Sequence, residues 1–317
     1  MSGGSQSGGG TGVREISTED AMDVRAALKQ AMARLEAARV SSHALAAELL
    51  LMHALGRDRA WLYSHLEVPL DVAAAENYFA LVNRRTAGEP VQYLTGKQEF
   101  WGLEFEVTPA VLIPRPETEH VVEVALERLS ARGVARGRPL RIADVGTGSG
   151  CLAVALAREF PHAEIFATDI SAAALEVAGR NAARHAVSKR IHFFQTDLLE
   201  ALAFSQVVTS HSPMPFDLIV SNPPYIGCDD AASLPREVRD HEPERALFAG
   251  GAGLEIYTRL IEQAGPLLRS EGILIVELGY GSAERIREMF HVKQCWCDVS
   301  IACDLAGIPR VLSAVIA

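Results

Sequence analysis

The sequence lacks any run of eighteen apolar residues, so no transmembrane helix is expected. Its first twelve residues are rich in Ser and Gly and contain no basic segment followed by an apolar one, which argues against a secretory signal. We interpret residues 1–16 as a disordered tail. Together these absences predict a protein of the cytoplasm with no membrane contact.

Cysteine is scarce and carries no recognisable pattern. The five cysteines are odd in number and include no pair of Cys-x-x-Cys knuckles, which argues against a disulfide framework and a zinc ribbon. Cys295, Cys297 and Cys303 lie close in sequence, but the spacing of the first two is that of one face of a strand. We therefore expect a reducing compartment and no metal site.

Basic residues are outnumbered. The chain has 30 Lys and Arg against 40 Asp and Glu, a formal net charge of −10, and no basic stripe with interleaved aromatic residues. An acidic surface repels phosphate backbones, so direct nucleic-acid binding is not expected. We expect the chain to act as a monomer.

What the sequence does contain first is a segment typical of helices. At 317 residues, the chain is about twice the size of a common domain, so two domains are expected. Residues 17–87 are rich in Ala, Leu, Glu and Arg, and they predict a small all-helical domain that serves as a docking module. Its apolar residues at helical spacing include Leu45, Leu49, Met52 and Leu55. Expected helix caps and breaks are Thr18 to Asp20, Ser41, Ser42, Gly56 and Pro69.

A second region predicts an α/β domain. Residues 88–116 read as a linker containing a short hairpin, and a helix is expected over residues 117–130. Beyond Leu140, strands are expected at 141–145, 164–168, 191–194, 216–221, 273–278, 296–302 and 310–316. Helices are expected at 151–159, 172–185, 254–268 and 282–290, with a long loop after Tyr225. This alternation predicts a doubly wound, mostly parallel seven-stranded Rossmann-like sheet in a domain of residues 117–317, ending in an antiparallel hairpin.

A glycine-rich loop lies between the first strand and the first helix of this domain. Its candidate ligand-binding residues are Gly146, Thr147, Gly148, Ser149 and Gly150, whose backbone N–H groups would face a ligand at the start of a helix. A tight turn could use glycine for steric reasons alone. The spacing is Gly-x-Gly-x-Gly and no Lys-Ser/Thr follows, which argues against a redox dinucleotide and against a P-loop.

Two carboxylates follow at the ends of the next two strands. Asp169 stands about twenty residues after the loop, where a carboxylate can accept hydrogen bonds from a ribose diol, although capping the helix after Ser171 is an alternative role. Asp197, with Leu198, reaches the same edge of the sheet and suits an adenine amino group. A ligand with a ribose, an adenine and no phosphate is indicated, and S-adenosylmethionine fits best.

The most specific pattern is Asn222-Pro223-Pro224-Tyr225 at the end of the fourth strand. An amide nitrogen is a poor nucleophile because its lone pair is delocalised, so a site that methylates it must accept both of its hydrogens. The Asn222 side-chain carbonyl and the Pro223 backbone carbonyl can do so, Pro224 stiffens the turn, and Tyr225 can stack on the planar group. A rigid turn without chemistry is the alternative. Beside the glycine loop and two carboxylates, the tetrapeptide predicts methyl transfer to a planar nitrogen.

Several segments together resemble the HemK/PrmC family of protein-glutamine N5-methyltransferases that act on peptide chain release factors. The matching segments are Gly88 to Gly96, Glu99-Phe100-Trp101-Gly102, Leu112 to Glu119, Asp144 to Gly150 and Val220 to Ile226. The resemblance covers residues 85–317 strongly, and the helical domain only by position and size.

The resemblance implies a substrate and roles for individual residues. The target would be the glutamine of the Gly-Gly-Gln motif of class 1 release factors, so that the enzyme modulates translation termination. Gly146 to Gly150 and Asp169 would bind S-adenosylmethionine, Asn222 to Tyr225 would hold the glutamine, and Phe100 would line the reaction site. In some members an aromatic residue takes the position of Leu198, where leucine keeps an apolar wall beside adenine.

Two other functions fit parts of the sequence. An adenine-N6 DNA methyltransferase also uses Asn-Pro-Pro-Tyr, but it needs a basic groove that this acidic chain lacks. A binding module derived from a methyltransferase would have no need of intact glycines, Asp169 and Asn222. Comparing release factor with duplex DNA as substrate separates the two enzymes, and a cofactor-binding and methyl-transfer assay separates the enzyme from the binding module.

Overall fold

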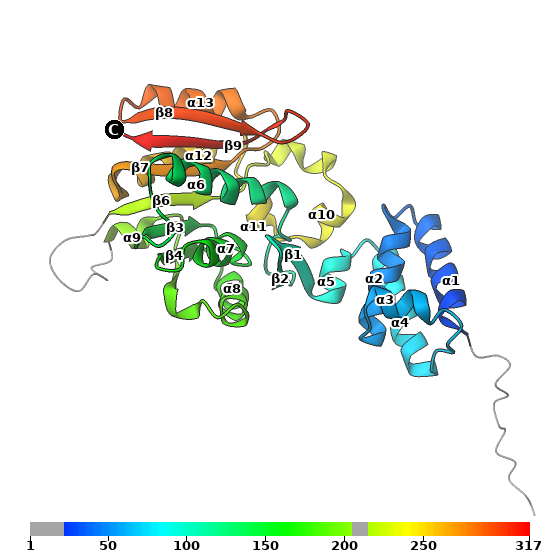
Figure 1. Cartoon of the computed structure of the whole chain (residues 1–317). Helices are drawn as coiled ribbons and strands as arrows, with labels where there is room; N and C mark the ends of the chain where they lie inside the picture. The colour runs from blue at the N-terminus through cyan, green and yellow to red at the C-terminus, as the bar shows by residue number, and fades with distance from the viewer. Residues whose placement is uncertain (1–21, 205–214) are drawn as a thin grey trace, which may run out of the picture. The chain divides into compact units, whose positions relative to one another are not determined.

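The computed structural model describes residues 22–204 and 215–317, which fall into two compact units divided between Ala87 and Gly88 (Figure 1). The expected tail and the expected cap at Thr18 to Asp20 lie outside these residues. No helix within the described ranges is both long enough and apolar enough to cross a membrane.

The first unit is helical, as predicted. Its helices are α1 (Val24–Ala37), α2 (His43–Leu55), α3 (Arg59–Ser64) and α4 (Val72–Thr86). Three of them begin at an aspartate, Asp23, Asp58 or Asp71, whose carboxylate accepts a hydrogen bond from the backbone N–H three residues later. Such caps satisfy N–H groups that a helix start leaves unpaired.

One local prediction in this unit, the Ser42 helix cap, is wrong. Ser42 precedes α2 in a left-handed conformation, and its side chain makes no capping hydrogen bond. The buried face of α2 carries Ala46, Ala47, Leu50 and Leu51, whereas Leu45 is 44% exposed. Helix α2 is apolar on nearly every side, so hydrophobic spacing identified the helix without identifying the side that packs inward.

The second unit begins with a short helix and the predicted hairpin. After α5 (Val91–Thr95), strands β1 (Lys97–Phe100) and β2 (Leu103–Glu106) pair antiparallel, with Lys97 opposite Glu106. The turn has positive φ at Trp101 and at Gly102. A 3₁₀ turn, η2 (Pro116–Thr118), then leads into α6 (Glu119–Ala131).

A seven-stranded sheet forms the centre of this unit and confirms the predicted fold class. In the order of the sheet its strands are β5 (Ile191–Gln195), β4 (Glu164–Asp169), β3 (Arg141–Val145), β6 (Phe216–Ser221), β7 (Leu268–Glu277), β9 (Pro309–Ile316) and β8 (Trp296–Cys303). The strands from β5 to β7 run parallel, and β9 pairs antiparallel with both β7 and β8. Strand β7 starts earlier than predicted, with an irregular register opposite Phe216 and Leu218.

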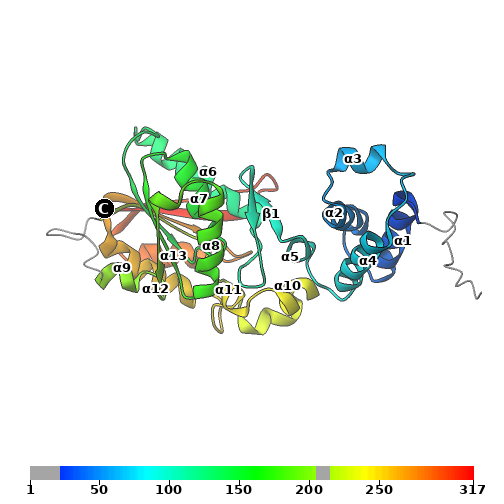
Figure 2. The same cartoon turned by 90° about the horizontal axis from the view of Figure 1, so that it is seen from below.

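Helices cover both faces of the sheet (Figure 2). Besides α6, they are α7 (Cys151–Glu159), α8 (Ala172–Arg184), η3 (Ser188–Arg190), α9 (Glu200–Phe204), α12 (Glu255–Ala264), η5 (Gly265–Leu267) and α13 (Ala283–Val292). One core joins α6, α7 and α8 to strand residues such as Ile142 and Val220, and the other joins α12 and α13 to Ala143 and Ile219. Because successive strand residues face opposite sides, a doubly covered strand reads as a continuous apolar run.

The segment after Tyr225 is not one long loop. It contains η4 (Cys228–Ser233), α10 (Arg236–His241) and α11 (Glu244–Leu247). Each is six residues or shorter, which is too short for hydrophobic periodicity to reveal.

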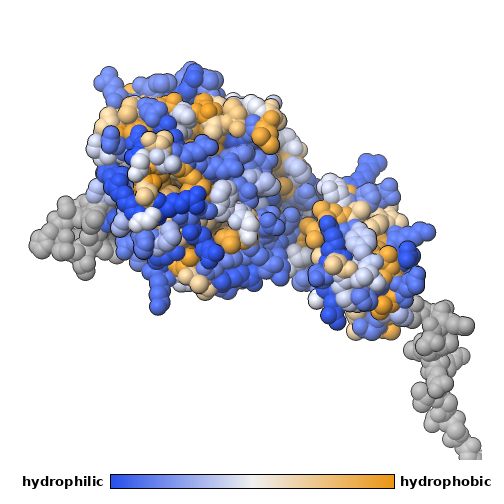
Figure 3. All heavy atoms as spheres, in the orientation of Figure 1, coloured by the Kyte–Doolittle hydropathy of each residue, from blue (hydrophilic) through white to orange (hydrophobic). Residues whose placement is uncertain are grey.

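On the face shown in Figure 3, hydrophobic residues lie in small groups among hydrophilic ones.

Candidate active site

Of the five parallel strands, β3, β4, β5 and β6 end beside a cavity of about 780 Å³. The chain leaves β3 for β4 on one side, while β6 lies against the other side of β3, and ligands of doubly wound folds bind at such a reversal. The predicted site residues that line the cavity are Gly146, Thr147, Gly148, Ser149, Asp169, Asp197, Leu198, Asn222 and Pro224. The sequence pattern therefore brings together residues from all four strand ends.

The glycine loop is shaped by Asp144, a fully buried residue of β3. Its Oδ2 accepts a hydrogen bond from the Thr147 hydroxyl at 2.6 Å and another from the Ala153 N–H at 3.0 Å. Burial raises the pKa of Asp144 to about 7, although these hydrogen bonds lower it. At Gly146 and Gly148 φ is positive, and a Cβ added there would meet no atom within 4 Å. The loop thus turns bare backbone toward open space, as close approach to a ligand requires.

Gly150 has a different role from its neighbours in the loop. It does not line the cavity, and a Cβ added there would come within 3.1 Å of the Ala178 Cβ, so its small size allows α8 to pack closely. Cofactor contact by Gly150 stays a prediction.

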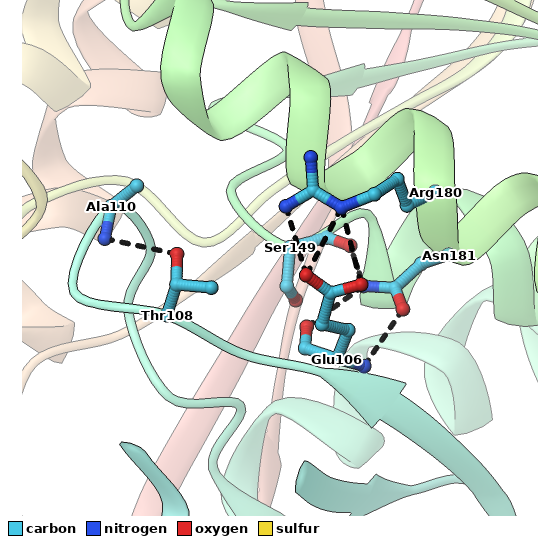
Figure 4. Close-up of polar contacts among 6 residues, drawn as sticks. All are labelled: Glu106, Thr108, Ala110, Ser149, Arg180 and Asn181. Atoms are coloured by element: carbon cyan, nitrogen blue, oxygen red, sulfur yellow. Dashed lines mark hydrogen bonds and ion pairs between the residues drawn. The ribbon is translucent and has the colours of Figure 1, made fainter. Parts of the chain in front are cut away.

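Asn181 of α8 joins the glycine loop to the hairpin (Figure 4). Its Nδ2 donates to the backbone carbonyls of Ser149 and Glu106, and its Oδ1 accepts from the Glu106 N–H. Arg180 pairs with the Glu106 carboxylate at 2.8 Å. The loop and the segment that follows Glu106, which lines the cavity at Ala110 and Val111, are therefore held by one buried side chain.

Asp169 lies between the glycine loop and α8. Its Oδ2 accepts from the Gly148 N–H and its Oδ1 from the Ser171 N–H, both at 2.9 Å. The helix cap itself is Ser171, whose hydroxyl accepts from the Ala174 N–H. Burial raises the pKa of Asp169. Each carboxylate oxygen retains a lone pair, so ribose hydroxyls could still donate to it.

Asp197 and Leu198 form the wall of the cavity at the end of β5. The Asp197 Oδ2 pairs with Arg259 of α12 at 2.7 Å, an ion pair that the sequence did not reveal. Leu198 has a positive φ of 49°. Because Arg259 pairs with Oδ2, the Asp197 Oδ1 is the oxygen left to accept a hydrogen bond. Its contact with adenine stays a prediction.

Asn222 presents an amide to the cavity at the end of β6. Its Nδ2 donates to the Thr118 hydroxyl at 3.0 Å, and within the described ranges nothing donates to its Oδ1 or to the Pro223 carbonyl oxygen. The Asn222 oxygen is thus left to accept a hydrogen bond. Pro223 is not among the residues that line the cavity, so its role as the second acceptor stays a prediction. Tyr225 does not line the cavity: its ring lies over Gly279, where an added Cβ would meet the Cδ2 at 2.9 Å.

Phe100 lies in the hydrophobic core, 1% exposed, with its ring edge-on to that of Phe105. It is not among the residues that line the cavity, so its place in the reaction site stays a prediction. Sequence reasoning also missed Asp144, Thr118, Asn181 and Arg259 as parts of the site. Thr118 and Asp144 could have been noticed, since they stand inside the Leu112 to Glu119 and Asp144 to Gly150 segments that carry the family resemblance.

S-adenosylmethionine fits the residues that line this cavity. The volume is in the range of small-molecule sites, the bare loop backbone offers N–H donors, and Asp169 offers acceptors. Polar side chains come from several different strand ends, as expected for a site that fixes the orientation of one ligand.

We expect Asp169→Ala to weaken S-adenosylmethionine binding by roughly 1.5 to 3 kcal/mol, about 10- to 150-fold in Kd, because charge-assisted hydrogen bonds to the ribose are lost. Asp169→Asn keeps one acceptor oxygen without the charge, so its loss should be intermediate. Calorimetric titration measures both, and thermal unfolding checks the fold. Unchanged affinity in a folded alanine variant would remove Asp169 from the ribose site.

Comparison with known proteins identifies the family. Residues 26–96 match the model of the PrmC N-terminal domain, and residues 122–234 match that of the methyltransferase small domain. A release factor glutamine methyltransferase from Koribacter versatilis (strain Ellin345) is 43% identical over 92% of this chain and 98% of that protein. Another, from Chlorobaculum tepidum, is 43% identical over 90% of this chain and 95% of that protein.

A solved structure shows the same fold. The catalytic domain of hMettl16, in complex with MAT2A 3'UTR hairpin 6, aligns with a TM-score of 0.51 at 19% identity, covering 74% of this chain and 81% of that one. Identity at that level carries the fold alone. From the 43% identity over 92% of its length, the chain belongs to the family of release factor glutamine methyltransferases.

Proposed function

We propose that the chain transfers the methyl group of S-adenosylmethionine to the side-chain amide nitrogen, N5, of the glutamine in the Gly-Gly-Gln motif of class 1 release factors. The observation that carries the proposal is the state of Asn222. Its NH₂ group donates to the Thr118 hydroxyl, and no group among residues 22–204 and 215–317 donates to its oxygen. Asn222 lines the same cavity as the glycine loop and Asp169. Relatives of the chain are named release factor glutamine methyltransferases, which supports the same class of substrate.

The residues of the chain position the amide rather than react with it. S-adenosylmethionine, the cofactor of this methyltransferase, supplies when bound a methyl group activated on a sulfonium. The Asn222 Oδ1 and the Pro223 carbonyl would accept the two hydrogens of the substrate NH₂ group, which aims the nitrogen lone pair away from them. Gly146, Gly148 and Asp169 would bind the cofactor. Pro223 has no backbone N–H, and its ring restricts the backbone, which would fix the direction of its carbonyl oxygen.

The experiment that tests this function compares substrates. Purified protein is incubated with labelled S-adenosylmethionine and a class 1 release factor, the same factor with its Gly-Gly-Gln glutamine replaced by alanine, or duplex DNA. We expect label in the intact factor alone, with mass spectrometry placing one methyl group on that glutamine. Methylation of DNA adenine without methylation of the release factor would contradict the proposal.

We further propose that the helical unit docks the release factor. Its match to the PrmC N-terminal domain supports the role, and no chemical group in its sequence suggests a part in the reaction. Deleting residues 1–87 should leave cofactor affinity nearly intact and raise the KM for intact release factor, while a short Gly-Gly-Gln peptide should be affected less. Equal losses for protein and peptide would refute docking.

A further inference from the structure

A chain of buried polar side chains lies behind Asn222. Thr118, which accepts the hydrogen bond of the Asn222 Nδ2, is 2% exposed, and so is Glu277 at the end of β7. Ser221 and Val276 are register partners in the parallel pair β6 and β7, so the next residues of the two strands, Asn222 and Glu277, emerge side by side. The turn η2 brings Thr118 to the same place.

Glu277 interacts with two hydroxyl groups near the tetrapeptide. Burial raises the pKa of Glu277 to about 7, and the nearby Thr118 and Tyr225 hydroxyls lower it. The Tyr225 hydroxyl lies 3.4 Å from Oε1, and Oε2 has no partner within the described ranges. A carboxyl group buried in this way is unusual unless it has a role, because burial disfavours its charged form.

An asparagine amide can turn over, and only one of its two orientations suits the proposed reaction. With Nδ2 toward Thr118, the Oδ1 faces the substrate as an acceptor. In the other orientation the NH₂ group would face the substrate NH₂, and two donors cannot pair. The Thr118 hydroxyl does not choose between these orientations alone, since it can either donate or accept.

An ionised carboxylate at Glu277 removes that ambiguity. It accepts hydrogen bonds only, so the hydroxyl proton of Thr118 is directed to it and the Thr118 oxygen is left to accept from Asn222. A protonated Glu277 can instead donate to Thr118, which then can donate to the Asn222 oxygen and favour the wrong orientation.

We propose that Thr118 and Glu277 are positioning residues that hold the Asn222 amide with its oxygen toward the substrate glutamine. The inference rests on the proposed function, and it identifies the residues that fix the orientation of the Asn222 acceptor. Neither residue touches the reacting nitrogen: Glu277 acts through Thr118, and Thr118 acts through Asn222.

Other charged and titratable groups face Glu277 and must be considered. Glu117 raises its pKa and Arg310 lowers it, and these two residues lie 3.7 Å apart as an ion pair. The Tyr257 hydroxyl donates to the Glu277 backbone carbonyl. The charges of Asp144 and Glu277 both raise the pKa of the buried Cys151 thiol, and burial raises the pKa of Asp144 to about 7 as well. Two carboxyls could therefore produce an acidic limb in a pH profile, and variants are needed to separate them.

The first arm of the test removes the Thr118 hydroxyl. Thr118→Val is close to isosteric but cannot accept from Asn222, whereas the matched control Thr118→Ser keeps the hydroxyl. We expect about a tenfold loss of kcat for release factor in the valine variant, the scale of one net hydrogen bond, and a loss within about threefold in the serine variant. Cofactor Kd and release factor KM should change little. Equal kcat values in the two folded variants would overturn the inference.

The second arm follows the single-turnover rate from pH 5.5 to 9 in the parent and in Glu277→Gln. The parent rate should fall as pH drops below about 7, where Glu277 takes up a proton. Glutamine cannot ionise, so its acidic limb should be absent. A limb that persists unchanged in Glu277→Gln, or a parent without one, would overturn the role of Glu277.

Thermal unfolding gives a readout independent of activity. The folded-state pKa of Glu277 is raised above its ordinary value of 4.5, so the folded protein binds this proton more tightly than the unfolded chain. As pH rises from about 4.5 to 7, the free energy of unfolding should therefore fall more in the parent than in Glu277→Gln. No methyl transfer to release factor by the parent at any pH would overturn the proposed function, and the inference with it. Transfer by the parent without these differences would overturn the inference alone.

Discussion

Asn222→Ala should lower the rate of methyl transfer to release factor about 10²-fold or more, the scale seen when one preorganised polar group of an active site is lost. The variant removes one of the two acceptors that orient the amide, and it leaves the glycine loop and Asp169 unchanged. Because that acceptor acts mainly in the transition state, turnover should fall much more than substrate affinity.

The fold should tolerate this change. When the Asn222 amide is removed, the Thr118 oxygen loses a donor, but its hydroxyl can still donate to Glu277, so no buried donor is left unpaired. The measurement is single-turnover transfer of labelled methyl, with cofactor affinity and thermal unfolding determined on the same preparation.

Asp169→Ala provides the matched comparison. Its defect lies in cofactor binding, so a saturating concentration of S-adenosylmethionine should restore its rate, whereas the Asn222→Ala rate should stay low at any concentration. If folded, cofactor-bound Asn222→Ala transfers methyl within about threefold of the parent, less than 1 kcal/mol on the transition-state scale, then Asn222 does not orient the reacting nitrogen.

The sequence predicted the order of strands and helices in the catalytic unit because each buried strand is a short apolar run between turn residues. The strands at 141–145 and 216–221 begin and end where predicted. The sequence predicted less where the helices show no hydrophobic periodicity. The short helices after Cys228 are too brief to show a face, and α2 is apolar on too many sides to show which one is buried.

The sequence also predicted the residues at the strand ends, but it could not predict their partners. Thr118 and Asn222 are 104 positions apart, and Asn181 and Glu106 are 75 positions apart. Arg259 comes from a helix far beyond Asp197, which it pairs with. Pairings at such separations depend on how the elements pack, and no local spacing encodes them. A buried acid such as Glu277 looks in sequence like the polar end of any strand.

Gly253→Ala should destabilise the protein by about 2–4 kcal/mol and impair methyl transfer, because Gly253 packs against the backbone of the tetrapeptide. Its φ is +74°, and an added Cβ would lie 2.6 Å from the Tyr225 carbonyl oxygen and 3.1 Å from the Gly227 nitrogen. Both neighbours are backbone atoms that flank Ile226, which forms a small bridge: the Ile226 N–H donates to the Leu247 carbonyl, and the Ala249 N–H donates to the Ile226 carbonyl. Neither can move aside without shifting the turn that carries Asn222.

Gly281→Ala separates the clash from the backbone conformation. Gly281 has the same φ of +74°, but a Cβ there would meet nothing within 4 Å, so alanine should cost only about 1 kcal/mol for the left-handed conformation. Urea unfolding of both variants, with equal slopes against denaturant, gives the difference in free energy directly. The excess loss at Gly253 measures how firmly the backbone around Tyr225 resists displacement. If the two alanines cost the same, the tetrapeptide yields freely to its neighbour, and a rigid turn is not what holds the Pro223 carbonyl toward the substrate.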